Sequence, residues 1–276
     1  MKIAITADNT CDIPQELIDK YNIYICYIPV IMGDDEFRDN LTHEQIYKYV
    51  EQTNQLPKTA ALSSYDYNEA FEKALKDNDA VIHFTLSYGI SSTGKNAEIA
   101  SKEFDNVFVV DTKSLSSGSG LVVLSCAEKI KEGKEIETIL KEINEEIEKV
   151  QASFLISKLN YLKKGGRCSS VAAIGANLLG IKILIQLIDG SMKATKKYIG
   201  KIETCLHKYL RDMIEENEPD YKRVFITSSS SMIGIKEKFV EEVKSLGFKE
   251  VIEMQAGSTI CSHCGPGTIG VLYMKK

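Results

Sequence analysis

The feature of the sequence that most constrains the fold is the alternation of short apolar runs with amphipathic windows. The runs are nearly continuous and rich in β-branched residues, which is typical of strands in a sheet covered on both faces. In the first part of the chain they cover residues 2–6, 24–30, 80–84 and 107–111. Windows with helical periodicity separate them, over residues 15–20, 43–52, 65–76, 93–102 and 115–132. This alternation predicts an α/β fold built in layers.

The second part of the chain repeats the alternation after a charged helix predicted over residues 135–149. Its mixed Glu and Lys positions are typical of a solvated face. We expect this helix to separate two α/β domains, residues 1–150 and residues 151–276. Beyond a short amphipathic segment at 155–164, strands are predicted over residues 181–188, 223–227, 249–254 and 268–274, and helices over 171–179, 202–215 and 233–246. Asp189-Gly190 predicts a hairpin after the first of these strands.

The composition indicates an acidic globular protein. The chain has 276 residues, 43% of them hydrophobic and 26% charged, with a formal net charge of -5. Because proteins that bind nucleic acid carry a basic patch, nucleic acid is not an expected partner. The first apolar stretch is too short for a secretory signal, and an odd number of cysteines, seven, fits reduced thiols, so a cytoplasmic protein is expected. Lys182 in the middle of the apolar window 171–188 favours buried interior over a membrane span.

The stretch over residues 83–97 predicts a strand, a polar loop and the start of a helix. The loop is rich in hydroxyl groups, including those of Ser87, Ser91, Ser92 and Thr93. Unpaired backbone N–H groups at a helix N-terminus, the positive end of the helix dipole and nearby hydroxyls together favour a bound anion. We therefore predict an anion site here, for a phosphate or a carboxylate.

One alternative for this loop is a nucleotide phosphate site. Gly89, Gly94 and Lys95 have the spacing of a P-loop. Asp111 ends the following strand, where a metal-binding Asp would stand. However, Asn96 lacks the hydroxyl that the magnesium ion of a P-loop needs. A phosphoryl-transfer enzyme built on residues 89–95 is thus one alternative hypothesis.

A serine hydrolase is the second alternative, with Ser91 as the nucleophile and His263 as the base. The two glycines of the loop lie one residue too far apart for a nucleophile elbow.

Cys261 and Cys264 form a Cys-x-x-Cys motif, but too few residues follow it for a thioredoxin fold. Because a structural zinc site needs about four ligands and no second pair is present, no metal is expected.

Arg167 ends the amphipathic segment, directly after Gly165 and Gly166. The glycines free the backbone, and a guanidinium group suits a phosphate or a carboxylate. A helix C-cap with basic residues in its last turn, Lys163 and Lys164, explains the same pattern. The residues alone leave both interpretations open.

Several stretches, taken in order along the whole chain, resemble the DegV family. No single motif decides the resemblance, which depends on their order. They are residues 8–14, 29–30, 37–39, 57–63, 90–93, 111–114, 159–167, 179–182, 189–190 and 263–267.

The resemblance implies two α/β domains with a long-chain fatty acid held between them, its carboxylate in the polar loop and its tail buried. At the matching positions, Thr59 and Ser91 would bind the carboxylate, and Ser92 would lie beside it. His263 would complete the hydrogen-bond network. Arg167 would lie near the phosphoryl-transfer or partner surface.

The resemblance also implies a carrier with no cofactor and no catalysis of its own. A separate ATP-binding kinase subunit would phosphorylate the bound carboxylate, and the acyl phosphate would enter phospholipid synthesis. Transient contact with a membrane is compatible with this role. The apolar window at 171–187 and the adjoining strands are the expected lining for the tail.

The sequence departs from the family pattern at four positions. Ser92 replaces a glycine, Gly94 an aromatic residue, Ala60 a serine and Ile183 a proline. Because Ser92 adds a side chain beside the carboxylate, we expect an altered head-group geometry. Ile183 favours a regular strand in place of a fixed turn, and with it a different preference for chain length or unsaturation.

Overall fold

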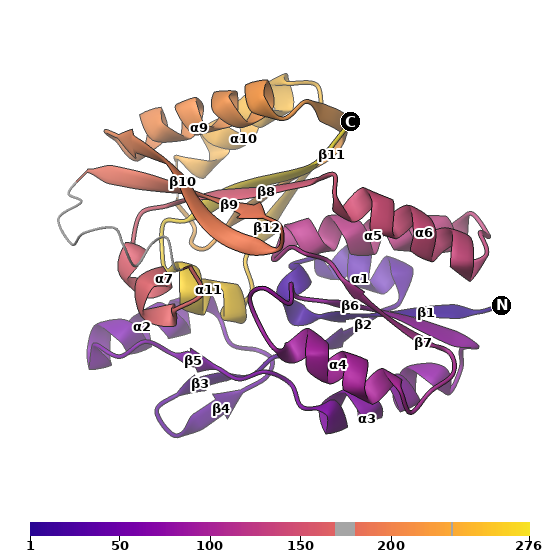
Figure 1. The fold of residues 1–276 in the computed structure, drawn as a ribbon. Helices are drawn as coiled ribbons and strands as arrows, with labels where there is room; N and C mark the ends of the chain where they lie inside the picture. The colour runs from indigo at the N-terminus through magenta and orange to yellow at the C-terminus, as the bar shows by residue number, and fades with distance from the viewer. Residues whose placement is uncertain (169–179, 233) are drawn as a thin grey trace.

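The first half of the chain builds a four-stranded parallel sheet, which lies in the lower half of Figure 1. The computed structural model describes residues 1–168, 180–232 and 234–276. The strand order is β2-β1-β6-β7, and every neighbouring pair is parallel. The strands are β1 (Ile3–Asp8), β2 (Ile23–Cys26), β6 (Ala80–Thr85) and β7 (Val107–Asp111). The α/β fold expected from the alternation is confirmed.

Helices cover both faces of this sheet (Figure 1). Residues of α3 and α4 pack with one face, and residues of α1, α5 and α6 pack with the other. All six helices predicted before residue 150 are present, with ends that differ from the prediction by at most two residues. Their bounds are α1 (Gln15–Tyr21), α2 (His43–Thr53), α3 (Ser64–Leu75), α4 (Thr93–Ser101), α5 (Ser117–Lys131) and α6 (Ile136–Ile147).

The single strand predicted over residues 24–30 is wrong, because the chain leaves the parallel sheet after Cys26. The N–H of Ile28 donates to Oδ1 of Asn9, and Pro29 has no N–H to offer a ladder. The chain then enters a separate antiparallel sheet in the order β4-β3-β5. Its strands are β3 (Val30–Met32), β4 (Asp35–Phe37) and β5 (Lys58–Thr59). This small sheet fixes the backbone at Thr59.

The second half of the chain forms a six-stranded mixed sheet in the order β10-β9-β8-β13-β11-β12. Among the described residues of this sheet, only β11 and β12 pair in parallel. Helices α9 and α10 lie on one side of it, and α7 and α11 lie on the side that faces the first half (Figure 1). The elements are α7 (Leu159–Gly165), α9 (Ile202–Glu216), α10 (Lys236–Ser245), α11 (Ser258–Cys264), β8 (Val150–Ile156), β9 (Ile181–Ile188), β10 (Ser191–Ile199), β11 (Pro219–Ser228), β12 (Glu250–Gln255) and β13 (Ile269–Lys275).

Two elements of the second half were not predicted from the sequence. Strand β8 begins three residues after the last residue of α6 and directly after the predicted helix 135–149, where no strand was predicted. Helix α11 is a single short segment rich in Ser, Thr and Cys, which has little helical signal of its own. The helix predicted over residues 171–179 lies outside the described residues. The predicted hairpin is confirmed, because Ser191 pairs with Ile188 and the two turn residues, Asp189 and Gly190, both have positive φ.

One apolar core runs across the contact between the two halves. It contains Phe71 and Val81 of the first half together with Phe154 and Ile183 of the second. All strands of the four-stranded and three-stranded sheets precede residue 112, whereas the six-stranded sheet begins at Val150. On this ground we propose residues 1–150 and 151–276 as the two domains. In the described parts of the chain, no helix has the length and apolar character needed to cross a membrane.

Candidate functional site

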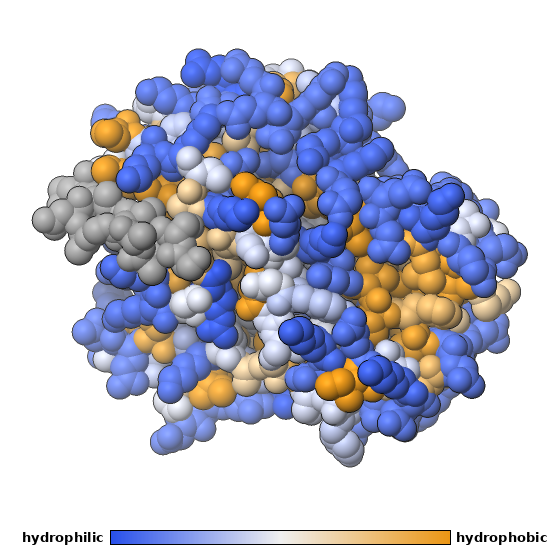
Figure 2. Space-filling view, viewed as in Figure 1, coloured by the Kyte–Doolittle hydropathy of each residue, from blue (hydrophilic) through white to orange (hydrophobic). Residues whose placement is uncertain are grey.

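A cavity of about 190 Å³ lies where the two halves meet. Five of its lining residues are those singled out in the sequence, namely Thr59, Ser91, Ser92, Arg167 and His263. On the face shown in Figure 2, hydrophilic residues cover most of the surface, and the main group of apolar residues lies between the α5–α6 pair and α4, over the edge of the four-stranded sheet. The fold thus brings together residues that lie more than 200 positions apart in the sequence.

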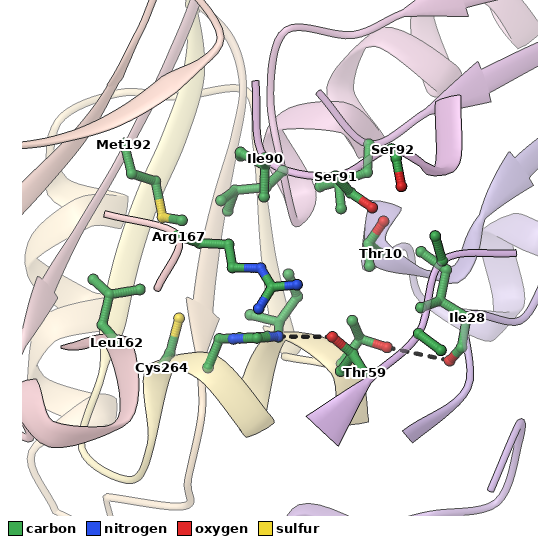
Figure 3. Close-up of a pocket in the computed structure, with 17 residues that line it drawn as sticks. Thr10, Ile28, Thr59, Ile90, Ser91, Ser92, Leu162, Arg167, Met192 and Cys264 are labelled. Atoms are coloured by element: carbon green, nitrogen blue, oxygen red, sulfur yellow. Dashed lines mark hydrogen bonds between the residues drawn. The ribbon is translucent and has the colours of Figure 1, made fainter. Parts of the chain in front are cut away.

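The loop that follows β6 carries Ser91 and Ser92 into the cavity wall (Figure 3). Oγ of Ser91 accepts a hydrogen bond from the N–H of Thr93 at 3.2 Å, so its own O–H remains available as a donor. Ser92 is the N-cap residue of α4, and its exposed side chain makes no capping bond. The predicted strand, polar loop and helix start is confirmed.

A buried hydrogen-bond network holds this loop from behind. The O–H of Tyr67 donates to Asp8 at 2.6 Å and also lies 2.8 Å from the hydroxyl of Thr93. Asp8 accepts a second hydrogen bond from the N–H of Leu86 at 2.9 Å. Burial raises the pKa of Asp8 to about 7, although both hydrogen bonds oppose the shift. The network ties both ends of the loop to β1.

His263 faces the loop from α11. Its Nε2 shares a hydrogen bond of 2.9 Å with Oγ1 of Thr59. Burial lowers the pKa of His263 to about 4, and the nearby charge of Arg167 adds to the shift. The imidazole is therefore neutral near pH 7. Gly165 packs so closely that a Cβ there would lie 2.6 Å from Nδ1 of His263, which fixes the ring from its other side.

Arg167 brings a positive charge to the mouth of the cavity. Its side chain is exposed, and Nη1 donates to the carbonyl of Gly165 at 2.6 Å. Figure 3 shows the guanidinium group extending over the cavity toward Thr59. Gly166 ends α7 with φ 70° and caps it through its N–H. The helix C-cap is confirmed. Arg167 lines the cavity, and its role toward an anion stays a prediction.

Most of the remaining wall is apolar. Its side chains come from both halves and include Ile28, Leu86, Ile90, Leu115, Leu162, Met192, Ile260 and Cys264. A second pocket of about 30 Å³ shares Leu115, Ile260 and Cys264 with the cavity and continues toward Phe154 and Leu272. The arrangement suits a ligand with an anionic head and an apolar body.

Comparison with known proteins decides the family. The DegV family model matches residues 2–276. The chain belongs to the DegV family. The resemblance drawn from the ordered motifs is therefore confirmed, and so is the fold class that it implied, because solved DegV structures align with the full length of the chain.

Three relatives of this DegV protein illustrate the match. A Thermotoga maritima protein named fatty acid-binding protein is 31% identical, over 98% of this chain and 96% of its own. A DegV family protein from Thermus thermophilus, whose solved structure is described by its fatty acid binding, has a TM-score of 0.93 and 27% identity over the whole of both chains. The structure of DegV, described as a fatty acid binding protein from Bacillus subtilis, has a TM-score of 0.87 and 27% identity over the same coverage.

The P-loop alternative finds no support in the DegV structure. Lys95 is exposed and does not line the cavity. The side-chain amide of Asn96 donates to the carbonyl of Leu62 at 2.6 Å, so it secures α4 to a neighbouring loop. The carboxylate of Asp111 accepts a hydrogen bond from the N–H of Lys113 at 2.9 Å. Among the described residues, no group of three or more His, Cys, Asp or Glu side chains is placed to hold a metal ion.

The hydrolase alternative is also unsupported by the geometry. Ser91 and His263 line the same cavity, but Nε2 of His263 bonds to Thr59. The charge that shifts the pKa of His263 is the positive charge of Arg167, whereas a hydrolase base is paired with a carboxylate. Cys261 and Cys264 are buried free thiols. Burial raises the pKa of both, that of Cys261 to about 12, which is the opposite of a reactive dithiol.

Two of the departures from the DegV pattern have clear structural settings. A Cβ at Gly94 would lie 2.2 Å from the ring of Tyr88, so the close approach of this ring requires the glycine. Ile183 lies inside β9 and pairs with Ile156 and Lys197 on its two sides, as expected for a regular strand. Ser92 keeps its side chain exposed at the rim.

The sequence analysis missed Thr10 and Thr259, which also line the cavity. The hydroxyl of Thr259 donates to the carbonyl of Ile28 at 3.4 Å. Thr10 lies within the first stretch that carried the family resemblance, residues 8–14. Its place in that stretch was the available signal.

Proposed function

We propose that this DegV protein binds a long-chain fatty acid in the cavity between its halves. The proposal is supported above all by the separation of polar and apolar side chains in the cavity wall. Hydroxyls, a neutral imidazole and a guanidinium group gather at one end, and apolar side chains form the remainder (Figure 3). Relatives with at least 27% identity over nearly the whole chain are described as fatty acid-binding proteins.

The polar end suits an ionised carboxylate. A carboxylate removed from water needs several hydrogen-bond donors to keep its charge. The hydroxyls of Thr59 and Ser91 are the proposed direct ligands, with Ser92 beside them and His263 bonded to Thr59. Arg167 adds a positive charge at the mouth, which lowers the cost of holding an anion there.

The apolar end suits an acyl tail. Burial of each CH₂ group is worth about 0.8 kcal/mol, so a tail of about sixteen carbons contributes on the order of 10 kcal/mol before ordering costs. The cavity and the smaller apolar pocket share the lining residues Leu115, Ile260 and Cys264. The tail therefore extends from the cavity toward Phe154 in this proposal. A ligand held in this way dissociates slowly and remains with the protein during purification.

We further propose that the protein is a carrier without catalysis of its own. A separate ATP-binding kinase would transfer the terminal phosphoryl group of ATP to a carboxylate oxygen, which gives an acyl phosphate and ADP. The exposed side chains of Ser92 and Arg167 at the rim support this role, because a partner protein can reach them. Cytoplasmic location and transient membrane contact during delivery belong to the same proposal.

Native mass spectrometry of the protein purified from cells tests the fatty-acid proposal. We expect a mass above that of the 276-residue chain, and release of a long-chain fatty acid on denaturation. Release of no fatty acid, together with binding of ATP and magnesium, would support the phosphoryl-transfer alternative. Hydrolysis of an ester probe that is lost in Ser91→Ala would support the hydrolase alternative.

A further inference from the structure

The short turn between β1 and α1 is fixed at both ends by buried carboxylates. It is a 3₁₀ turn over Asn9–Cys11, flanked by Asp8 and Asp12. Asp12 accepts hydrogen bonds from the hydroxyl of Ser116 and, at 2.9 Å, from the N–H of Gly257, the N-cap residue of α11. Asp8 holds the loop after β6, as described above. The turn is therefore tied to both walls of the cavity.

The residue at the centre of this turn is Thr10. Its side chain is 1% exposed and lines the cavity. Figure 3 shows its hydroxyl pointing toward that of Ser91. Within the described part of the chain, Oγ1 of Thr10 has no hydrogen-bond partner. A buried hydroxyl without a partner destabilises the folded protein, since water would satisfy it in the unfolded chain.

We infer that Thr10 is a further ligand of the bound carboxylate, whose oxygen accepts the hydrogen bond that the lipid-free protein leaves unmade. The inference rests on the proposed function. It explains why the turn is anchored so firmly, because a ligand-binding hydroxyl must be held in the binding geometry before the ligand arrives. It also assigns a role to the sequence stretch 8–14, in which none of the other proposed site residues lies.

If Thr10 has this role, removal of its hydroxyl should weaken fatty-acid binding without destabilising the lipid-free protein. A structural hydroxyl stabilises the lipid-free protein, whereas an unpaired one destabilises it. Thr10→Val keeps the side-chain shape and removes the hydroxyl. Thr85→Val is the matched control, because Thr85 is also buried with an unpartnered Oγ1 among the described residues but does not line the cavity.

The experiment measures hexadecanoic acid affinity and the melting temperature of delipidated protein for the wild type, Thr10→Val, Thr10→Ser and Thr85→Val. We expect Thr10→Val to weaken binding about tenfold or more, as loss of a hydrogen bond to a charged group does. Its lipid-free melting temperature should equal or exceed that of the wild type. Thr10→Ser should bind nearly as well as the wild type, and Thr85→Val should leave affinity unchanged.

Two outcomes would overturn the inference. The first is wild-type affinity in Thr10→Val. The second is a lower melting temperature or a failure to fold for delipidated Thr10→Val, because the hydroxyl would then be structural. A wild-type protein that binds no hexadecanoic acid, and from which no fatty acid is released, would instead overturn the proposed function itself. Wild-type binding that is weakened by Ser91→Ala but not by Thr10→Val would contradict the Thr10 inference alone.

Discussion

Oγ1 of Thr59 and Nε2 of His263 lie 2.9 Å apart, although 204 positions separate the two residues in the chain. Thr59 ends the two-residue strand β5 of the first half, and His263 lies on α11 of the second half. Their hydrogen bond crosses the cavity wall where the proposed carboxylate binds. The head-group site is therefore complete only when both halves are packed together.

Removal of either proposed hydroxyl ligand should weaken fatty-acid binding. Because hydrogen bonds to charged groups are worth about 1.5–3 kcal/mol, Ser91→Ala and Thr59→Val should each lower affinity by about tenfold or more. Lys95→Ala is the control, since Lys95 is exposed and does not line the cavity. Fatty acid retained per protein after purification gives the measurement. Wild-type retention in both hydroxyl variants would place the carboxylate elsewhere.

The titration of His263 should reveal its buried setting. In lipid-free protein, NMR of the ring protons should show a midpoint near 4, well below the ordinary value of 6.5, because burial and Arg167 disfavour the charged form. A carboxylate bound beside the ring favours the imidazolium ion, so bound fatty acid should raise the pKa. In the lipid-free protein the pKa of His263 is lower in the folded than in the unfolded state, so His263 contributes stability above pH 6.5 that is lost as the pH falls toward 4. A lipid-free midpoint near 6.5 would contradict the buried, neutral ring.

The network behind the Ser91 loop should be important for stability. Tyr67→Phe removes an O–H that bonds to Asp8 and Thr93, both buried. Urea unfolding should show a loss of about 1–3 kcal/mol, since a buried carboxylate loses a donor. Tyr65→Phe is the matched control, because Tyr65 is 68% exposed and bonds only to Glu69 among its described neighbours. Equal effects of the two substitutions would argue against the network.

Arg167 should matter more for the partner reaction than for lipid retention. Its guanidinium is exposed, so solvent screens its attraction to a bound carboxylate, and Arg167→Gln should lower affinity less than Ser91→Ala does. Phosphorylation of the bound fatty acid by an added kinase partner and ATP should fall much more. Lys163→Gln removes a neighbouring exposed charge and should change neither measurement. Affinity loss as large as in Ser91→Ala would make Arg167 a primary head-group ligand.

Elements with a strong local period could be predicted from the sequence, and elements that depend on distant partners could not. Helix α6 shows this first class, because Ile136, Ile139, Ile143 and Ile147 repeat at helical spacing and are all buried. Strand β5 belongs to the second class. It has two residues and exists only because Ile31 and Val30 pair with them. Pro29, which lies inside the predicted strand 24–30, was a readable signal that the prediction did not use.

The candidate site shows the same limit. The loop around Ser91 has a local signature, a strand followed by hydroxyls and a helix, and the sequence predicted its anion-binding character. The distances that join Thr59, His263 and Arg167 to this loop are set by packing between the halves, so only the family resemblance placed all of them at one site. Thr10 was missed because an unpartnered hydroxyl can be recognised only when its surroundings are known.

A crystal structure of the purified protein with its bound lipid would show directly where the carboxylate and the acyl tail lie. We predict continuous electron density for an acyl chain between the halves, with a carboxylate oxygen within hydrogen-bond distance of Oγ of Ser91 and Oγ1 of Thr59 and the tail against Leu115 and Ile260. Density for a nucleotide at residues 89–95, or a lipid whose carboxylate lies away from both hydroxyls, would contradict the account.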